Sequence, residues 1–368
     1  MCIEHTHKNI SEKIQEWYHN ILSLRSTEAM QNKEEISELI KDHSDDKLWT
    51  LYNLIKSKHC LTFDREEMSD ATYRSIKDQT STDEECRILI YDYAGQSAFY
   101  KEKYETAIFY YQKAEKLLHA ITDNFEKADF LKRLGISYYR VDEMYLANQY
   151  LHRAKSIFST DTFYKLNELS CRLIQASILS ETLEFEEAEK HYTTLLEESL
   201  FIPEMNFFCL RSFGLHLLRS NQLEKAERIF TTILCEKEYN LSSSMEQFII
   251  KNKIDLSTVL FRQAKNEIAY SFLKEGMNEL TDLNEIEYMC RSKILYHLYV
   301  EHDKKAVEDE IDRLSFSNMN IEASELASDT STFFKQRGQF QEALEFMELA
   351  QMLRMKSKII STKEVSNT

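Results

Sequence analysis

Three side chains at the start of the chain are of types that bind metal ions. Cys2, His5 and His7 offer one thiol and two imidazoles, which are the groups that ligate zinc and other transition metals. No second cluster accompanies them, and the remaining cysteines and histidines are dispersed without a CxxC or HExxH spacing. We therefore expect no bound metal and no cofactor of the protein's own.

The acidic turn Ser44-Asp45-Asp46 is the second group with chemical potential, and it precedes an amphipathic segment. In one interpretation a residue of the turn caps a helix and the others favour the helix's positive end. In the other, the turn is an acidic surface directed at the active site of a partner protein. The chain contains no GxSxG, Walker or HExxH motif, so no enzyme class is indicated by a motif.

Composition limits the fold and the partners. The chain of 368 residues has one proline and five glycines, too few turn residues for a hairpin-rich β fold, so we expect an all-α protein. A formal charge of −16 opposes binding to nucleic acid, since phosphate backbones require a basic surface. No apolar run approaches 18 residues, so we expect no membrane span. The seven cysteines are scattered, which indicates reduced thiols and a cytoplasmic protein.

A regular alanine series indicates a repeat protein. The series comprises Ala107, Ala147, Ala188, Ala226, Ala269, Ala306 and Ala343, with spacings of 37 to 43 residues. In the tetratricopeptide (TPR) pattern, small residues let two antiparallel helices approach closely, and large residues fill the groove to the next repeat. Gly95 with Tyr111 and Gly214 with Phe230 match that pattern. We expect a right-handed superhelix of about seven TPR-like hairpins, longer than the usual 34-residue repeat.

Three further amphipathic segments precede the repeats. Residues 10–24, 28–41 and 46–60 each place apolar side chains at helical spacing, which predicts a three-helix bundle. Residues 64–84 are polar and weakly periodic and are interpreted as a linker. The expected organisation is thus a bundle over 1–63, a linker over 64–84, a repeat domain over 85–355 and a frayed tail over 356–368.

The first helix of each hairpin lines the concave face of a TPR superhelix. The residues expected there are Ser177, Arg211, Ser212, Leu215, Arg219, Asp255, Thr258, Arg262 and Arg291. Polar groups with arginines suit a short extended peptide, whose backbone and terminal carboxylate they can bind. The alternative interpretation is that these side chains only solvate a concave surface.

Several stretches resemble the Rap family of Bacillus regulators. They are SEKIQEWYHNI (11–21), DDKLWTLYNLIKSKHCL (45–61), FYKEKYETAIFYYQKAEKLL (99–118) and FEKADFLKRLGISYYRVDEMYLANQYLHRA (125–154). The resemblance covers essentially the whole chain and is strongest up to about residue 200. It implies that the bundle, the linker and the first repeats dock on a response regulator. It also implies that a short Phr peptide binds the repeats, whereupon the bundle swings onto them and the partner is released.

The resemblance implies one of two activities. Some members remove phosphate from a response regulator's aspartyl-phosphate in the sporulation phosphorelay, and others keep a transcription-factor response regulator off DNA. The partner-binding residues it implies are Trp17, Tyr18, Asp45, Asp46, Trp49, Tyr52 and Asn53. The family's catalytic glutamine position falls on Asp46, which is shorter, lacks an N–H donor and brings negative charge toward the phosphoryl group. We therefore expect phosphatase activity to be weakened or lost, and any Mg²⁺ to belong to the partner.

Peptide sensing also departs from the family pattern. The family's fourth repeat commonly carries asparagines that pair with the peptide backbone, and the matching positions here are Ser212 and Leu215. Three possibilities remain: the peptide differs, it is bound by Arg211, Arg219 and Asp255 instead, or the protein no longer responds to a peptide. Two further readings stay open from the residues: a plain TPR adaptor, and a peptide-gated transcription factor. The second is disfavoured because the N-terminal region is short, has no clear helix-turn-helix and belongs to a strongly acidic protein.

Overall fold

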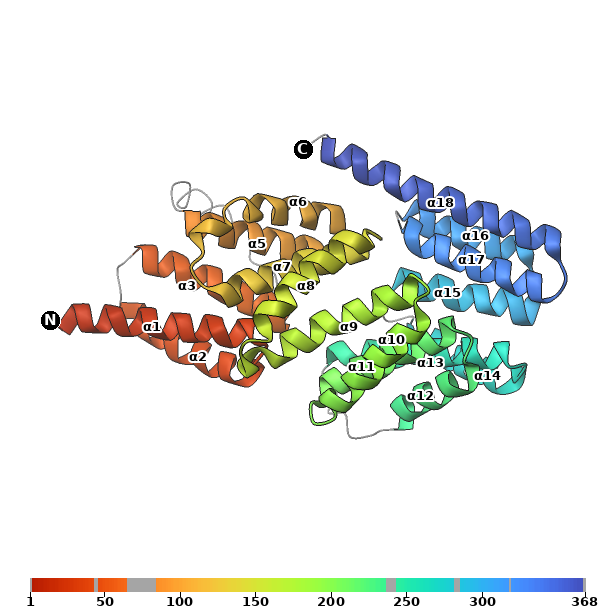
Figure 1. Cartoon of the computed structure of the whole chain (residues 1–368), viewed down its shortest axis with the longest axis horizontal. Helices are drawn as coiled ribbons and strands as arrows, with labels where there is room; N and C mark the ends of the chain where they lie inside the picture. Colours follow the sequence, from red (N-terminus) through yellow and green to blue (C-terminus); the bar gives the residue numbers. More distant parts are fainter. Residues whose placement is uncertain are drawn as a thin grey trace. The chain divides into compact units, whose positions relative to one another are not determined.

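The computed structural model describes residues 2–42, 46–64, 84–235, 243–280, 285–317 and 319–366 (Figure 1). These ranges are helical apart from short turns, and no strand occurs in them, which confirms the all-α prediction. Contacts divide the chain into two compact units, residues 1–178 (unit 1) and 179–368 (unit 2). Within the described ranges, no helix has the length and apolarity needed to span a bilayer.

Unit 1 begins with the expected three-helix bundle. It consists of α1 (Cys2–Leu22), α2 (Ser26–Leu39) and α3 (Asp46–His59), with a short 3-10 turn, η1 (Ile40–Asp42), after α2 and a π-helical turn, η2 (Cys60–Asp64), after α3. Each helix turns one apolar stripe inward, as helical periodicity requires. The core they share includes Ile10, Ile14, Trp17, Ile21, Ile36, Leu48, Tyr52 and Ile55. The first helix starts at Cys2 rather than near residue 10.

Two helical hairpins and the start of a third complete unit 1. They are α5 (Glu84–Tyr100) with α6 (Tyr104–Glu115), α7 (Asn124–Arg140) with α8 (Met144–Phe158), and α9 (Lys165–Glu181), which crosses into unit 2. The short 3-10 turns η3 (Leu118–Ala120) and η4 (Thr162–Tyr164) connect them. The expected linker lies almost wholly outside the described residues, which resume at Glu84.

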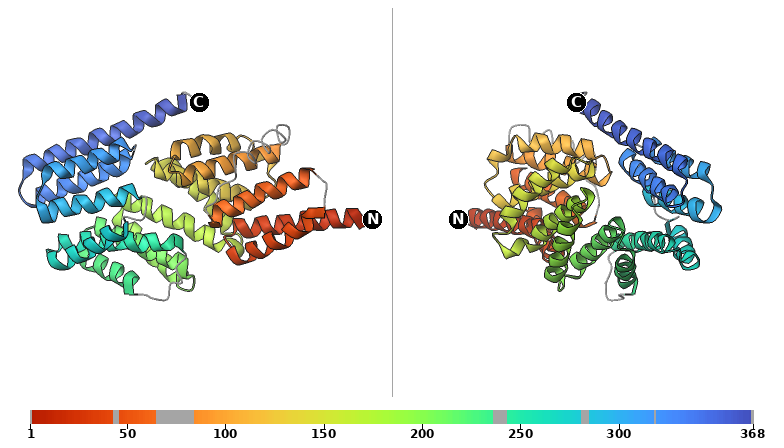
Figure 2. Two further views of the ribbon diagram at one scale, coloured as in Figure 1. Left: turned by 180° about the vertical axis from the view of Figure 1, so that it is seen from behind. Right: turned by 45° about the vertical axis from the view of Figure 1, so that its right-hand side comes forward.

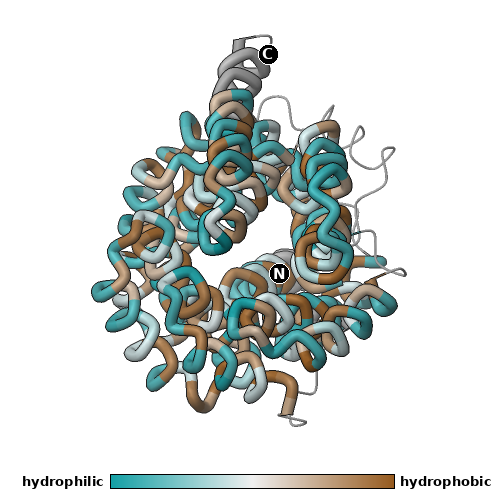
Figure 3. The backbone as a smooth tube through the Cα atoms, turned by 90° about the vertical axis from the view of Figure 1, so that its right-hand side faces the viewer, coloured by the Kyte–Doolittle hydropathy of each residue, from teal (hydrophilic) through white to brown (hydrophobic). Residues whose placement is uncertain are grey.

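Unit 2 continues the hairpins to the end of the chain (Figure 2). Its helices are α10 (Phe185–Ser199), α11 (Pro203–Arg219), α12 (Leu223–Cys235), α13 (Ser243–Arg262), α14 (Asn266–Leu280), α15 (Ile286–Tyr296) with the π-helical turn η5 (His297–Glu301), α16 (Lys304–Phe316), α17 (Asn320–Gln336) and α18 (Phe340–Ser366). Polar and apolar segments alternate along the helices (Figure 3), as expected of amphipathic repeats. The last helix runs to Ser366, where a frayed tail was expected, because residues 356–366 contain no glycine or proline to end it.

The same turn joins the two helices of every hairpin. One residue per turn adopts the left-handed conformation, at Glu102, Asp142, Leu183, Asn221, Ala264, His302 and Gly338. The next backbone N–H then reaches back to the end of the first helix, as from Glu143 to the Tyr138 carbonyl oxygen at 3.0 Å. This pairing satisfies carbonyl groups that a helix end leaves without partners. The turns therefore repeat in step with the alanine series.

Close packing inside each hairpin explains the small residues of the repeat pattern. A Cβ on Gly214 would lie 2.6 Å from the Phe230 ring, and one on Gly95 would lie 2.7 Å from the Tyr111 ring. Tyr111 also meets Phe130 of the next hairpin edge to face, with ring centroids 5.6 Å apart. The large residue thus fills space within its own hairpin as well as toward the next, and only glycine leaves room for it.

Candidate functional site

A buried lysine lies where the bundle meets the hairpins of unit 1. Lys58, near the end of α3, places its ammonium nitrogen 2.7 Å from Oδ2 of Asp92 on α5 and 3.5 Å from Oδ2 of Asp129 on α7. It also donates to the Tyr18 hydroxyl at 3.3 Å. The lysine side chain is only 7% exposed. A buried charge is tolerated only with such partners, so these contacts specify where α3 lies against α5 and α7.

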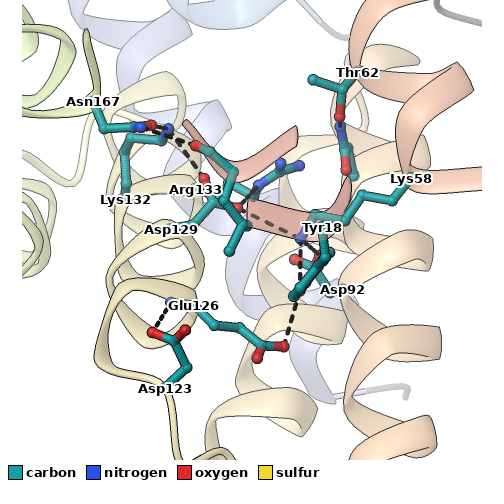
Figure 4. A network of polar contacts seen from close by, with 12 residues as sticks. Tyr18, Lys58, Thr62, Asp92, Asp123, Glu126, Asp129, Lys132, Arg133 and Asn167 are labelled. Atoms are coloured by element: carbon teal, nitrogen blue, oxygen red, sulfur yellow. Dashed lines mark hydrogen bonds and ion pairs between the residues drawn. The ribbon is translucent and has the colours of Figure 1, made fainter. Parts of the chain in front are cut away.

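Asp129 is the acidic centre of the same network (Figure 4). Its carboxylate lies 3.1 Å from Lys132 Nζ and accepts a 2.9 Å hydrogen bond from Nε of Arg133. Burial on its own would raise the pKa of Asp129. The surrounding cations Arg133, Lys132 and Lys58 outweigh burial and hold that pKa well below its ordinary value. Asp129 therefore stays ionised and keeps three cations in place.

The network reaches from α7 to the end of α1 through one asparagine. Lys132 Nζ donates to Oδ1 of Asn167, and Nδ2 of Asn167 donates to the Leu22 carbonyl oxygen at 2.8 Å. Asn167 is fully buried. A second link lies beside it, where His19 of α1 contacts the Tyr164 hydroxyl at 2.7 Å. These two contacts join α1 to α9 and to η4 within unit 1.

Glu126 completes the network on the other side of Lys58. The Tyr18 hydroxyl donates to Glu126 Oε1 at 2.9 Å. Burial raises the pKa of Glu126 to about 7, although Lys58 and the Tyr18 hydrogen bond both lower it. We call the set Tyr18, Lys58, Asp92, Glu126, Asp129, Lys132, Arg133 and Asn167 the Lys58 network. Polar contacts are specific and can be exchanged for water, so the network can define a docked position of the bundle that is also reversible.

Of the residues expected to contact a partner, Trp17 and Tyr52 are buried in unit 1 and Tyr18 is half-buried. Trp17 has no exposed surface, donates from Nε1 to Nδ1 of His59 at 3.2 Å and packs on Tyr52 at 5.8 Å. Tyr52 is 5% exposed, and the Tyr18 hydroxyl belongs to the Lys58 network. A side chain without exposed surface cannot contact a partner in this conformation. In this conformation these aromatic residues instead pack against α3, and large aromatic side chains contribute much of the stability of a small core.

Other expected docking residues lie on or beside α3. Trp49 is half-buried and meets Tyr52 edge to face at 5.7 Å, while Asn53 keeps a partly exposed side chain. Asp46 is the first residue of α3, but its side chain, like the whole of Asp45, lies outside the described residues. A docking role for Trp49, Asn53 and the acidic turn therefore stays a prediction.

The first helices of three hairpins in unit 2 meet at a buried ion pair. Arg211 of α11 lies 2.6 Å from Oδ2 of Asp255 on α13 and donates to the Tyr288 hydroxyl of α15 at 2.7 Å. Tyr288 in turn donates to Asp255 at 3.2 Å. Asp255 is 2% exposed, and burial raises its pKa although Arg211 opposes this. Arg211 and Asp255 therefore form a buried ion pair. Together with Tyr288 it fixes the relative positions of α11, α13 and α15.

Three further arginines of these helices are more accessible. Arg219 donates to Ser180 Oγ at 3.0 Å, Arg262 lies 3.4 Å from Asp329, and Arg291 lies 3.2 Å from Glu287. Arg262 and Arg291 line a pocket of about 30 Å³ together with Thr258. That space holds about one water molecule. In this conformation the pocket is therefore too small for a peptide.

Four predicted peptide contacts remain to be placed. Ser212 and Leu215 are half-buried on α11, with Leu215 packed on the core of unit 2. The Thr258 hydroxyl bonds to the Ile254 carbonyl oxygen at 3.0 Å. Ser177 belongs to unit 1, where its hydroxyl bonds to the Leu173 carbonyl oxygen at 3.2 Å. The structure thus brings the arginines, Thr258 and Asp255 together within unit 2, and Ser177 lies in the other unit.

Acidic residues among these arginines escaped the sequence reasoning. Glu325 of α17 has its pKa raised to about 7, first by burial and then by Glu181, while Arg291 and Arg219 lower it. The side chain of Glu325 is nevertheless exposed, so water weakens the effect of the surrounding protein on its carboxylate. Glu325 lies on the first helix of the seventh hairpin, and this position could have identified it as a residue of the concave face. The Lys58 network was also missed, although Lys58 continues the apolar stripe of Leu51, Leu54 and Ile55.

Among the described residues, no group of three or more histidine, cysteine, aspartate or glutamate side chains is arranged to hold a metal ion. The side chains of Cys2, His5 and His7 lie outside the described residues.

Comparisons with known proteins match either the N-terminal bundle or nearly the whole chain. A family model described as response regulator aspartate phosphatase H, N terminal, matches residues 4–64. The chain is 23% identical to the regulatory protein RapD of Bacillus subtilis (strain 168) over 352 residues, which cover 92% of this chain and 97% of RapD. The crystal structure of a Rap protein complexed with competence and sporulation factor matches with a TM-score of 0.83 and 21% identity, covering 95% and 99% of the two chains. That likeness shows the fold.

A further relative has a different name. The chain is 30% identical over 365 residues to the type II methyltransferase M.CeqI of Rhodococcus hoagii, which covers 97% of this chain and 70% of that protein. Nearly a third of M.CeqI therefore has no counterpart here.

Proposed function

The chain belongs to the Rap family, and from this premise we propose that it binds a response regulator and is controlled by a short Phr-type peptide in sporulation or competence signalling. The observation that carries the proposal is the match of residues 4–64 to the N-terminal part of a response regulator aspartate phosphatase. In unit 1 this segment is the bundle and its π-helical turn, fixed to the hairpins by the Lys58 network. In this proposal the exposed side of α3 contacts the response regulator.

Binding without hydrolysis is the mechanism that we favour. Water-positioning residues in phosphoryl hydrolysis orient the nucleophile without adding charge, as glutamine does. The resemblance aligns Asp46, the first residue of α3, with the position of that glutamine, and a carboxylate there would repel the phosphoryl oxygens. Sequestration of the response regulator needs only a complementary surface. Any Mg²⁺ in the complex would be held by the partner.

The charges of unit 2 support a peptide as the controlling ligand. Arg219, Arg262 and Arg291 can bind a carboxylate through two parallel hydrogen bonds, and the Arg291 Nε group is buried without a partner among the described residues. Glu325 and Asp329 offer the opposite charge on α17. A short peptide carries both charges, at its two ends. Because the pocket at Arg262 and Arg291 is only about 30 Å³, binding must separate α13, α15 and α17.

The state of the cysteines supports a cytoplasmic site of action. Cys60, Cys171, Cys209, Cys235 and Cys290 are free thiols in the structure. Burial raises the pKa of Cys171 to about 12, so this thiol is unreactive. A protein with unpaired buried thiols suits a reducing compartment.

Two other functions receive less support. The name of M.CeqI suggests methyl transfer, but this chain matches only 70% of that protein. A plain TPR adaptor would need the hairpins alone, and it gives no reason for a bundle fixed by a buried lysine.

The proposal is tested by incubating the intact chain with a radiolabelled phosphorylated response regulator beside the variant Asp46→Gln. We expect the wild type to bind the regulator and leave its phosphate, and the variant to bind equally and gain hydrolysis. Failure of both proteins to bind any response regulator would contradict the proposal. Peptide control is tested separately by thermal unfolding with candidate pentapeptides, since a ligand at about 100 times its dissociation constant stabilises the folded state by about 2.7 kcal/mol.

A further inference from the structure

A second pocket lies in unit 1, apart from the Lys58 network. It has a volume of about 520 Å³ and is formed where η3, α7 and α8 meet. Its apolar lining comes from Leu118, Leu131 and Ile157, one residue from each of these elements. Pockets that bind small molecules measure roughly 300 to 1,000 Å³ and are mostly apolar with a few polar groups. This pocket has that size and that kind of lining.

Four of the five polar side chains that line the pocket are of basic types, and the fifth is Ser156. Lys127, Arg153, His119 and His152 line it, and no aspartate or glutamate does. Such a cluster is a local exception in a chain whose formal charge is −16. Because the chain as a whole has more acidic than basic residues, this basic cluster is specific to the pocket.

The basic side chains of the pocket have few partners among the described residues. Neither the Lys127 ammonium nor the His152 ring has a hydrogen-bond or ion-pair partner among the described residues. Arg153 reaches Glu115 only at 4.0 Å, and its guanidinium also lies over the Tyr150 ring at 5.6 Å. His119 has an exposed contact with Glu84 at 3.3 Å. At least two donors are therefore available to an anion.

We propose that this pocket binds a small organic anion, a carboxylate or phosphate ester with a compact apolar body. The anionic group lies against Lys127 and Arg153, where charged hydrogen bonds are about twice as strong as neutral ones. The apolar body covers Leu118, Leu131 and Ile157, whose burial contributes in proportion to the area removed from water. The site would give unit 1 a ligand of its own, independent of the peptide proposed for unit 2.

A matched set of probes tests this inference on the intact chain. Hexanoate and hexanamide share an apolar chain and differ in charge, while phenyl phosphate and inorganic phosphate share the anion and differ in the apolar body. Binding is followed through the ¹³C-labelled δ-methyl resonance of Ile157, assigned with Ile157→Val. The charge variant is Lys127→Met with Arg153→Gln, and the control is Lys116→Met, an exposed lysine of the same unit outside the pocket.

We expect the Ile157 resonance to move with hexanoate or phenyl phosphate at concentrations up to ~10 mM and to remain still with hexanamide and inorganic phosphate. The charge variant weakens binding by about tenfold or more, and Lys116→Met leaves it unchanged. Hexanoate and phenyl phosphate then separate a carboxylate ligand from a phosphate ligand. The inference is overturned if no probe moves the resonance, if hexanamide binds as well as hexanoate, or if the charge variant binds like the control. Binding of an acidic peptide without either small probe would also overturn it.

Discussion

The hydroxyl of Tyr18 donates a 2.9 Å hydrogen bond to Oε1 of Glu126, a residue 108 positions later in the chain. The bond joins α1 of the bundle to α7 of the second hairpin. It lies beside the Lys58 ammonium, which is 3.3 Å from the same hydroxyl. One tyrosine thus connects Glu126 with Lys58, and these polar contacts act together with the apolar packing of Leu22 in the hairpin core.

Removing the Tyr18 hydroxyl should loosen this connection. Tyr18→Phe leaves the ring in place but deprives Glu126 and Lys58 of a partner, and an unsatisfied buried group costs about 1–3 kcal/mol. We expect a lower midpoint of thermal unfolding. Tyr145→Phe is the control, because Tyr145 is 74% exposed on α8. Equal midpoints for the two variants would show that the hydroxyl does not hold the bundle.

Replacing Lys58 should cost more. Lys58→Met removes the cation that Asp92 and Asp129 share, and breaking a buried ion pair on one side destabilises by about 3–5 kcal/mol. Lys56→Met, an exposed lysine one half-turn earlier in α3, should change stability by less than about 0.5 kcal/mol. Chemical denaturation of both variants gives the comparison. A Lys58→Met protein as stable as Lys56→Met would mean that the network contributes nothing.

The raised pKa of Glu126 predicts a pH-dependent contribution to stability. Its pKa lies near 7 in the folded protein and 4.5 in the reference state. Between these pH values Glu126 therefore binds a proton in the folded protein that the unfolded chain releases. Stability from this group is therefore complete below about pH 4.5 and is lost as pH rises through 7, by at most about 3 kcal/mol. His59, whose pKa falls to about 4 on burial, acts in the opposite direction.

The variant Glu126→Gln separates the two effects, because it keeps a hydrogen-bond acceptor for Tyr18 and cannot titrate. Thermal unfolding is measured for both proteins from about pH 5 to about pH 8. We expect the wild type to lose stability relative to the variant as pH rises. Parallel curves over this range would contradict the role assigned to Glu126.

The repeated turn predicts a stabilising substitution. Leu183 adopts φ 67° and is 68% exposed, a conformation that costs an L-residue about 1–2 kcal/mol and glycine nothing. Leu183→Gly should raise stability by about 0.5–1 kcal/mol after the entropy of glycine is included. Gly338→Ala is the reverse test, since Gly338 has φ 74° with open space around it. A destabilised Leu183→Gly protein would count against the strain.

Much of the fold could be predicted from short-range patterns in the sequence. The alanine series gave the register of the hairpins, and each left-handed turn residue lies four or five positions before its alanine. Gly95 and Tyr111 were paired by the repeat pattern and do touch, because close helix packing acts at fixed spacing. The three helices of the bundle followed from their apolar stripes in the same way.

The site was harder to predict because its contacts are long-range. Trp17 was expected at a surface, and its burial depends on Tyr52 and His59, which lie on another helix. Arg211 was expected to face a ligand, and the structure pairs it with Asp255, 44 positions away. A charged residue on a first helix has the same appearance in sequence whether it binds a ligand or its neighbour. Only tertiary packing distinguishes the two.

The central claim is that the exposed side of α3 binds a response regulator, and a binding titration tests it most directly. A fluorescently labelled response regulator is titrated with the intact chain, with Asn53→Arg on α3 and with Lys116→Met as the control. We predict saturable binding that Asn53→Arg weakens by about tenfold or more, because a bulky charge in an interface costs at least ~1.4 kcal/mol, and that Lys116→Met leaves unchanged. Binding that is absent for every response regulator tried, or equal for all three proteins, would contradict the account.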